Sequence, residues 1–264
     1  MYDNGLRIDG VAVSGRLAPL SALVARGRLV HIIGPNGAGK STLLLRLAGL
    51  LSGEGEVWLA GRPLLCQTPA QQARWRACLL QQQLPTGLMP VFAYLGLHAP
   101  RTAPISGVDT VLAMLSECLG LSDKLSRPMS HLSGGEWQRV RLAAVLLQIW
   151  PTLNPQGYLL LLDEPMSSLD IRQQAALDGL LSELCAAGVT VIASAHDLNH
   201  TLFHADDVWM LSQGQVMAQG TAQAVMQVAA LSTLFGVPFR RIRGGDRDWL
   251  YYHNDEQPES ASGK

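Results

Sequence analysis

Short apolar runs alternate with helix-forming segments along most of the chain. The runs at 29–33 and 158–162 are almost wholly apolar, as in parallel strands that are buried on both faces. We expect further strands at 77–81, 189–194, 207–212 and 215–219, an edge strand at 56–60, and helices at 40–50, 134–149, 171–186 and 197–204. This alternation predicts an α/β fold with a mostly parallel core sheet and helices on both of its faces.

The pattern changes between about 82 and 131. Proline and glycine punctuate short helical patterns near 90–97 and 107–120, and strand-like runs are absent from the sequence there. We therefore expect an inserted helical subdomain. The predicted division is one domain at 1–252, with a core at about 1–81 and 136–220, a helical subdomain at about 82–135, a C-terminal hairpin at about 236–252, and a disordered polar tail at 253–264.

Composition narrows the class of protein. The chain has 264 residues, 48% of them apolar and 16% charged, and its formal net charge is −1. This balance suits a globular α/β domain and argues against a nucleic-acid partner bound through a basic face. No run reaches about 18 uninterrupted apolar residues, so no membrane span is expected. The four cysteines are scattered, with no histidine nearby at metal-ligand spacing, and predict reduced thiols with neither a disulfide framework nor a zinc site.

A glycine-rich loop follows the first apolar run. The stretch 34–42 reads GPNGAGKST and fits the phosphate-binding pattern G-x-x-x-x-G-K-[ST] between a strand and a helix. Backbone N–H groups of such a loop, and the positive end of the helix, attract phosphate. Lys40 is expected to reach the β- and γ-phosphates of a nucleotide, Ser41 to bind Mg²⁺, and Thr42 to assist. The candidate phosphate-binding residues are Gly34, Pro35, Asn36, Gly37, Ala38, Gly39, Lys40, Ser41 and Thr42.

Three further side chains follow apolar strands and are expected at the same edge of the sheet. Asp163 ends the leucine run and is predicted to hold Mg²⁺, and the adjacent Glu164 to polarise the attacking water. His196 follows the strand at 189–194 and is expected to contact the γ-phosphate and to orient Glu164 or the water. A carboxylate pair alone is often only a helix cap, and a lone histidine is more often structural, so these roles depend on the phosphate loop.

A second candidate phosphate site begins the helix at 134–149. Ser133 is a good N-cap, and Glu136 lies at capping-box spacing from it, so the simplest interpretation is a well-capped helix. However, Gly134 and Gly135 leave the first turn bare, with N–H groups open to an anion. This helix starts far from the first loop in sequence and need not face the same nucleotide.

Taken together, these motifs resemble the ATP-binding subunit of an ABC transporter. The resemblance covers 34–42, Gln81, LSGGEWQR at 132–139, LLLLDEP at 159–165, SSLD at 167–170 and His196. It implies a P-loop NTPase cassette with a RecA-like core, an antiparallel β subdomain and a helical subdomain. It also implies ATP and Mg²⁺ as ligands, and two copies paired head to tail with each ATP between the 34–42 loop of one copy and the 133–135 segment of the other.

The same resemblance assigns further roles. Ser133, Gly134 and Gly135 would contact the partner's ATP, Asp170 would cross the dimer interface, and Gln81 would sense Mg²⁺ and the attacking water. Gln82 and Gln83 remain alternatives to Gln81. The stretch 11–20 lacks the aromatic residue that usually stacks on adenine in this family; Arg16 and Tyr2 are possible substitutes.

Three segments narrow the resemblance to the group of vitamin B12 and iron–siderophore importers. They are QQQLPTGLMPVFAYL at 81–95, IWPTLNPQG at 149–157 and AHDLNHTLFHA at 195–205. The implied partners are a multi-span membrane permease and, through it, a periplasmic substrate-binding protein. The implied location is peripheral, on the cytoplasmic face of a bacterial inner membrane. An iron–siderophore or haem importer ATPase, and a soluble ABC ATPase without a transport role, are the alternatives.

Overall fold

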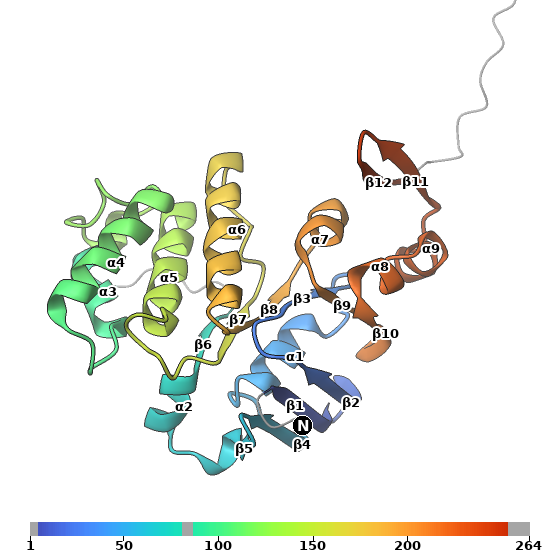
Figure 1. The fold of residues 1–264 in the computed structure, drawn as a ribbon, viewed down its shortest axis with the longest axis horizontal. Coiled ribbons are helices and arrows are strands. Elements are labelled where there is room, and N and C mark those ends of the chain that lie inside the picture. The colour runs from blue at the N-terminus through green and yellow to red at the C-terminus, as the bar shows by residue number, and fades with distance from the viewer. Residues whose placement is uncertain (1–4, 81–86, 253–264) are drawn as a thin grey trace, which may run out of the picture.

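The computed structural model describes residues 5–80 and 87–252, and a six-stranded sheet forms the centre of this part of the chain (Figure 1). Its strand order is β10-β9-β3-β8-β7-β6, with every pair parallel except β9 and β10. The strands are β3 (Leu29–Ile33), β6 (Arg76–Leu79), β7 (Leu159–Leu162), β8 (Thr190–Ser194), β9 (Asp207–Ser212) and β10 (Gln215–Thr221). The predicted strands are confirmed, although β6 ends two residues early and β10 runs two residues further.

Both faces of this sheet are covered, as the continuous apolar runs predicted. Along β7, Leu160 and Leu162 belong to one core cluster, which includes side chains of the helices after residue 90. Leu159 and Leu161 belong to a second cluster, around α1 (Lys40–Leu47). All four leucines are fully buried. A strand buried on both faces needs apolar side chains at every position, which explains why this run does not alternate.

An antiparallel sheet packs on the other side of α1. Its strand order is β2-β1-β4-β5, formed by β1 (Leu6–Val13), β2 (Leu17–Val24), β4 (Glu54–Leu59) and β5 (Arg62–Pro63). The edge position predicted for 56–60 is wrong, since β4 pairs with β1 on one side and with β5 on the other. The helix α1 ends at Leu47, three residues before the predicted end, because Gly49 adopts a left-handed conformation with φ of +70°.

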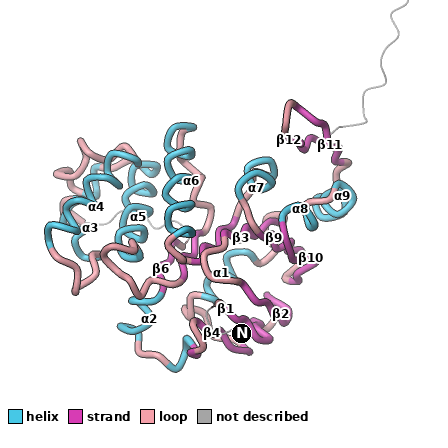
Figure 2. The backbone as a smooth tube through the Cα atoms, in the orientation of Figure 1, coloured by secondary structure: helices cyan, strands magenta, loops and turns pink. Residues whose placement is uncertain are grey.

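Helices dominate the described residues between β6 and β7. The helices α3 (Val91–His98) and α4 (Ile105–Cys118) both pack on α5 (Gly134–Ile149), at one end of the molecule (Figure 2). The helix α6 (Ile171–Ala186) follows β7 and packs against α4 and β8. The helix α2 (Pro69–Trp75) was not predicted, because it buries none of its residues and so carries no apolar stripe.

The C-terminal part continues as α7 (Leu198–His204), α8 (Ala222–Val225), α9 (Val228–Phe235) and a hairpin of β11 (Phe239–Gly244) and β12 (Arg247–Tyr252). The Asn199 side chain joins α7 to β12, since its Nδ2 donates to Leu250 O at 2.9 Å and its Oδ1 accepts from Leu250 N at 2.7 Å. The tail expected at 253–264 lies outside the described residues. Among the described helices, none is long and apolar enough to cross a membrane.

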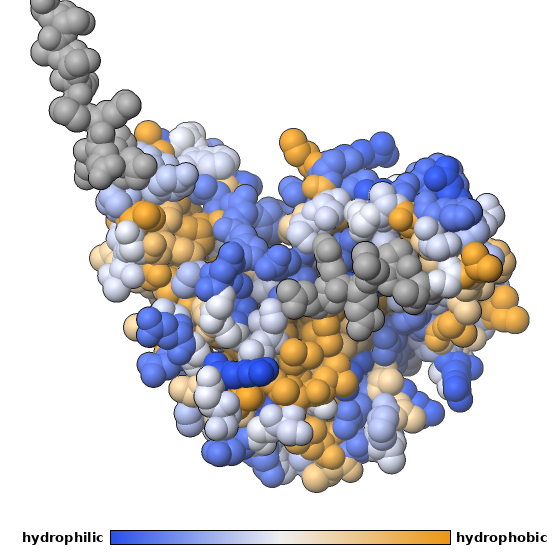
Figure 3. All heavy atoms as spheres, turned by 180° about the vertical axis from the view of Figure 1, so that it is seen from behind, coloured by the Kyte–Doolittle hydropathy of each residue, from blue (hydrophilic) through white to orange (hydrophobic). Residues whose placement is uncertain are grey.

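The surface is mixed in polarity. Seen from behind, apolar patches lie between polar ones (Figure 3). Several exposed apolar side chains belong to the segment around α3, namely Leu88, Met89, Phe92 and Leu97. All four cysteines lie in the described part of the chain, where each is unpaired.

Candidate nucleotide-binding and catalytic site

The glycine-rich loop at 34–42 joins β3 to α1 at the carboxyl end of the sheet. Gly34, Gly37 and Gly39 have φ values of +155°, +79° and +101°, which side chains disfavour. Gly34 also packs tightly on β9, because a Cβ there would lie 2.1 Å from the Leu211 carbonyl oxygen. The loop therefore requires its glycines both for conformation and for space.

The first turn of α1 is open to an anion. Gly39 occupies the N-cap position and no side chain caps the helix, so the N–H groups of its first turn lack partners within the helix. The Lys40 ammonium is buried and donates to Gly34 O at 2.7 Å and Pro35 O at 3.1 Å. Burial lowers the pKa of Lys40, and the nearby Glu164 and Asp163 carboxylates oppose that effect. Lys40 thus ties the end of the loop to its start and lies near the carboxylates of Asp163 and Glu164, both predicted to act at the site.

A cavity of ≈600 Å³ opens over this loop. Its lining comprises Asn36 to Thr42 together with Gly15, Arg16, Glu164, Gln213 and Gly214. Arg16, one of the two possible adenine contacts, therefore lies at the cavity, while Tyr2 is outside the described residues. The volume of this cavity is in the range of sites that bind small molecules.

Gly214 is a positioning residue that the sequence did not reveal. It has a φ of +75°, and a Cβ there would lie 2.5 Å from Arg16 O. Its N–H donates to Ala38 O at 2.9 Å, and its carbonyl accepts from Ala18 N at 2.8 Å. The turn between β9 and β10 therefore ties the phosphate loop to the start of β2.

Ser194 links the two predicted catalytic carboxylate residues. Its hydroxyl donates to Asp163 Oδ1 at 2.6 Å and accepts the Glu164 N–H at 2.8 Å. Both Ser194 and Asp163 are buried, whereas the Glu164 side chain is 46% exposed. Asp163 is thus fixed in orientation, whereas the Glu164 side chain remains accessible to solvent. The apolar pattern at 189–194 gave the strand but no sign of this role.

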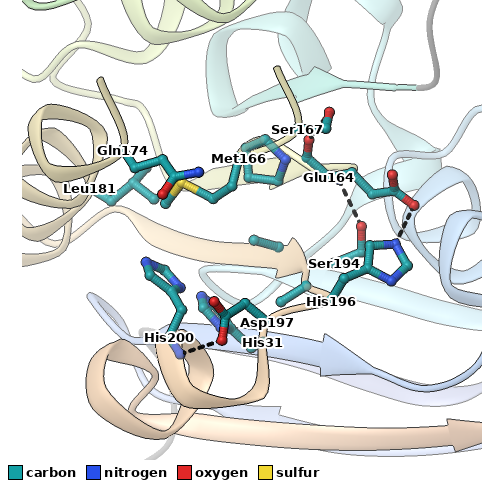
Figure 4. Close-up of a pocket in the computed structure, with 13 residues that line it drawn as sticks. His31, Glu164, Met166, Ser167, Gln174, Leu181, Ser194, His196, Asp197 and His200 are labelled. Atoms are coloured by element: carbon teal, nitrogen blue, oxygen red, sulfur yellow. Dashed lines mark hydrogen bonds and ion pairs between the residues drawn. The ribbon is translucent and has the colours of Figure 1, made fainter. Parts of the chain in front are cut away.

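His196 and Glu164 are brought together from the ends of neighbouring strands. His196 Nε2 lies 2.6 Å from Glu164 Oε1, and the two side chains point toward one another (Figure 4). Glu164 adopts a left-handed backbone conformation with φ of +50°, which is uncommon outside glycine. The pair has the geometry of a carboxylate base held by a histidine.

The second glycine-rich segment starts α5. Ser133 Oγ accepts the Glu136 N–H at 3.2 Å, and Glu136 Oε2 accepts the Ser133 N–H at 2.8 Å, so the predicted capping box is confirmed. The N–H of Ser133, followed by other nearby donors, lowers the pKa of Glu136. A Cβ added at Gly134 would meet nothing within 4 Å, and one at Gly135 would approach Ser168 at 3.5 Å. Of the described residues, those at 133–135 are not among the ones that line the cavity over the phosphate loop.

Asp170 also caps a helix. Its Oδ1 accepts the Gln173 N–H at 2.8 Å at the start of α6, and its own N–H donates to Gln173 Oε1 at 3.2 Å. Gln81, Gln82 and Gln83 lie outside the described residues, so the predicted sensor stays a prediction.

The fold and these motifs define an ATP-binding cassette. The sequence profile of the family described as ABC transporter matches residues 17–167, and the chain belongs to that family. It is therefore an ATP-binding subunit of a family whose members generally hydrolyse ATP. Among solved structures, an ATP-binding subunit of an ABC transporter superposes with a TM-score of 0.78 at 25% identity, over 88% of this chain and 98% of that one.

Curated relatives are closer in sequence. The vitamin B12 import ATP-binding protein BtuD of Pectobacterium atrosepticum is 56% identical over 245 residues, which cover 93% of this chain and 98% of the relative. The protein of the same name from Yersinia pseudotuberculosis is 53% identical over 93% of this chain and 97% of the relative. A metal-chelate type ABC transporter in an inward-facing conformation shares the fold at a TM-score of 0.71 and 21% identity, over 94% of this chain and 96% of that one.

Proposed function

We propose that this chain is the ATP-hydrolysing subunit of a membrane importer whose cargo is vitamin B12. Relatives that carry this function in their names are 52–56% identical to the chain over at least 90% of its length. None of the catalytic candidates is expected to touch the cargo, so the identification of the cargo depends on these relatives. The inference that the chain hydrolyses ATP depends instead on its own side chains.

The catalytic roles follow from the arrangement at the sheet edge. Lys40 and the N–H groups of the loop bind the nucleotide phosphates. Glu164 accepts a proton from the attacking water, and His196, 2.6 Å from that carboxylate, orients it and contacts the γ-phosphate. Fixed donors and a fixed base need little rearrangement during the reaction, which is how positioning and charge lower the barrier to phosphoryl transfer.

Mg²⁺ fits the donor set at this site. Ser41 lies in the first turn of α1, and the buried Asp163 carboxylate accepts a hydrogen bond from the Ser194 hydroxyl at 2.6 Å. A hydroxyl and a carboxylate are the hard oxygen ligands that Mg²⁺ prefers. Once bound, the ion would neutralise charge on the β- and γ-phosphate oxygens. Gln81 remains a further proposed ligand and water sensor.

The working site is shared between two copies. The observation that carries this step is that Ser133, Gly134 and Gly135 do not line the cavity over their own phosphate loop, although their helix start is suited to an anion. In a head-to-tail pair the segment 133–135 meets the partner's γ-phosphate, and Asp170 lies near the interface. ATP draws the two copies together, and hydrolysis removes the bridge and lets them part.

The same closure drives transport through a membrane permease. The exposed apolar side chains of Leu88, Met89 and Phe92 suit a short helix of that subunit, which would dock on the helical subdomain beside α3. We propose that the chain acts on the cytoplasmic face of a bacterial inner membrane, with a periplasmic substrate-binding protein on the other side. An iron–siderophore or haem importer would use the same chemistry; transport assays in vesicles with each cargo distinguish these substrates. A soluble ABC ATPase would fail to co-purify with a permease.

Mixing two inactive variants tests the shared site. Lys40→Ala removes the phosphate lysine and Ser133→Arg blocks the second segment, so either variant alone should lack ATPase activity. A mixed pair still contains one intact site, formed by the loop of the Ser133→Arg copy and the 133–135 segment of the Lys40→Ala copy. An equal mixture should therefore recover roughly a quarter of the wild-type rate. Full activity of Ser133→Arg alone would contradict the shared site.

A further inference from the structure

A cluster of imidazoles lies beside the catalytic site but takes no part in the proposed chemistry. His200 and His204 are one turn apart on α7, and their rings stack with centroids 4.5 Å apart. Asp178 reaches them from α6, with Oδ1 at 2.9 Å from His200 Nε2 and Oδ2 at 3.7 Å from His204 Nε2. One carboxylate therefore faces both imidazoles.

We propose that Asp178, His200 and His204 form a binding site for a divalent transition metal of the Zn²⁺ class. Two histidines at i and i+4 on one helix face are a known zinc-binding arrangement, and a carboxylate is a common third ligand. Ligand atoms of a tetrahedral zinc site lie about 3.4 Å apart, given bonds of about 2.1 Å. Here the ligand atoms of all three residues lie within 4.8 Å of one another, so small side-chain rotations complete the site and water supplies the fourth ligand.

The surroundings hold the imidazoles in fixed orientations. The buried His31 ring stacks on His200 at 5.7 Å and 10° and limits the orientations of that ring. His31 itself bonds through Nδ1 to Thr201 Oγ1 at 3.0 Å, so it is a packing partner of the site. The Arg247 charge, which disfavours positive charge on His204, opposes metal binding and limits its affinity.

Metal at this place would connect two elements of the catalytic site. The helix α7 starts two residues after His196, and α6 starts at the Asp170 cap. His200 also lines a cavity of ≈260 Å³ together with Glu164 and His196 (Figure 4). A metal ion that bridges α6 and α7 would therefore fix the position of His196 relative to Asp170.

Cobalt titration of the purified, nucleotide-free chain tests this site, because Co²⁺ replaces Zn²⁺ and its visible absorption reports four-coordinate geometry. We expect one saturable Co²⁺ per chain, displaced by Zn²⁺. His204→Gln and Asp178→Asn should each weaken binding at least about tenfold. The matched controls are His98→Gln, which alters a histidine on α3, and His196→Ala, which removes a competing ligand beside Glu164; both should bind as the wild type does. Far-ultraviolet circular dichroism checks that all four variants fold.

Thermal unfolding gives an independent readout. Zn²⁺ at about 100 times its Kd should raise the Tm of the wild type by about 5 °C or more, and should leave His204→Gln nearly unchanged. The proposal is overturned if the wild type shows no saturable Co²⁺ absorption. It is also overturned if the absorption survives in both ligand variants or is lost only in His196→Ala.

Discussion

The Ser194 hydroxyl donates to Asp163 Oδ1 at 2.6 Å, and both residues are buried at the carboxyl end of neighbouring strands. This bond fixes the carboxylate proposed to hold Mg²⁺. Ser194→Ala should leave Asp163 and the Glu164 N–H without this partner, which costs about 1–3 kcal/mol in the free energy of unfolding. It should also lower ATPase activity by about tenfold or more and raise the Mg²⁺ concentration needed for half-maximal rate.

Ser116→Ala is the matched control for that variant. Ser116 is equally buried, but its Oγ has no hydrogen-bond partner among the described residues. Its removal should leave ATPase activity and Mg²⁺ dependence unchanged. If Ser194→Ala behaves in both assays like Ser116→Ala, Ser194 does not position Asp163 for catalysis.

Substitution of Gly134 tests contact with the partner's nucleotide without disturbing the fold of the chain. Because a Cβ at Gly134 meets nothing within 4 Å, Gly134→Ala should preserve stability or raise it by up to about 1 kcal/mol. The added methyl would obstruct the partner's γ-phosphate and reduce turnover by about tenfold or more. Gly179→Ala, on α6 with equally open space, should stabilise the chain without changing turnover. Urea unfolding and ATPase assays check both variants, and equal turnover in the two would argue against contact at Gly134.

Asn199 anchors the C-terminal hairpin to α7 through its two hydrogen bonds with the Leu250 backbone, at 2.9 and 2.7 Å. Asn199→Ala removes both bonds and should cost about 1–3 kcal/mol, because the buried Leu250 backbone loses its partners. Protease cleavage within 239–252 should become faster, as followed by mass spectrometry. Asn199→Asp retains an acceptor for the Leu250 N–H and should show a smaller increase; unchanged cleavage in Asn199→Ala would show that other contacts hold the hairpin.

Thiol reactivity provides a pH-dependent prediction. Burial raises the pKa of the Cys185 thiol to about 11, whereas Cys66 is exposed. Only the thiolate reacts, so alkylation of Cys185 should rise about tenfold for each pH unit and keep rising up to about pH 11. At pH 8, iodoacetamide should modify Cys66 first, and Cys66→Ser should remove the fast phase seen by peptide mass mapping. Rapid modification of Cys185 at pH 8 would contradict the raised pKa of its thiol.

The sequence predicted those helices and strands whose determining residues lie within the element or directly beside it. The apolar runs of β3, β7 and β8 are visible because these strands are buried on both faces, and the caps Ser133 and Asp170 lie next to the helices that they start. The strands β1 and β2 were not located, since register shifts interrupt their pairing and break the alternation of buried and exposed positions along β1. The helix α2 was not predicted because it carries no apolar stripe.

The same distinction applies to the site. The phosphate loop is contiguous in sequence and was predicted residue by residue. Ser194 and Gly214 act through partners that lie 31 and 176 positions away in sequence, in the pairs with Asp163 and Ala38, so no local pattern indicates their roles. Serine at a strand end and glycine in a turn are too common to single out.

Each copy is proposed to hold half of each catalytic site, and the ATPase rate per chain as a function of protein concentration tests this division most directly. Analytical ultracentrifugation identifies the concentrations at which the purified chain is single or paired. We predict that the rate per chain falls toward zero as pairs dissociate, with ATP binding retained. A single copy that hydrolyses ATP as fast as the pair would contradict a catalytic site shared between two copies.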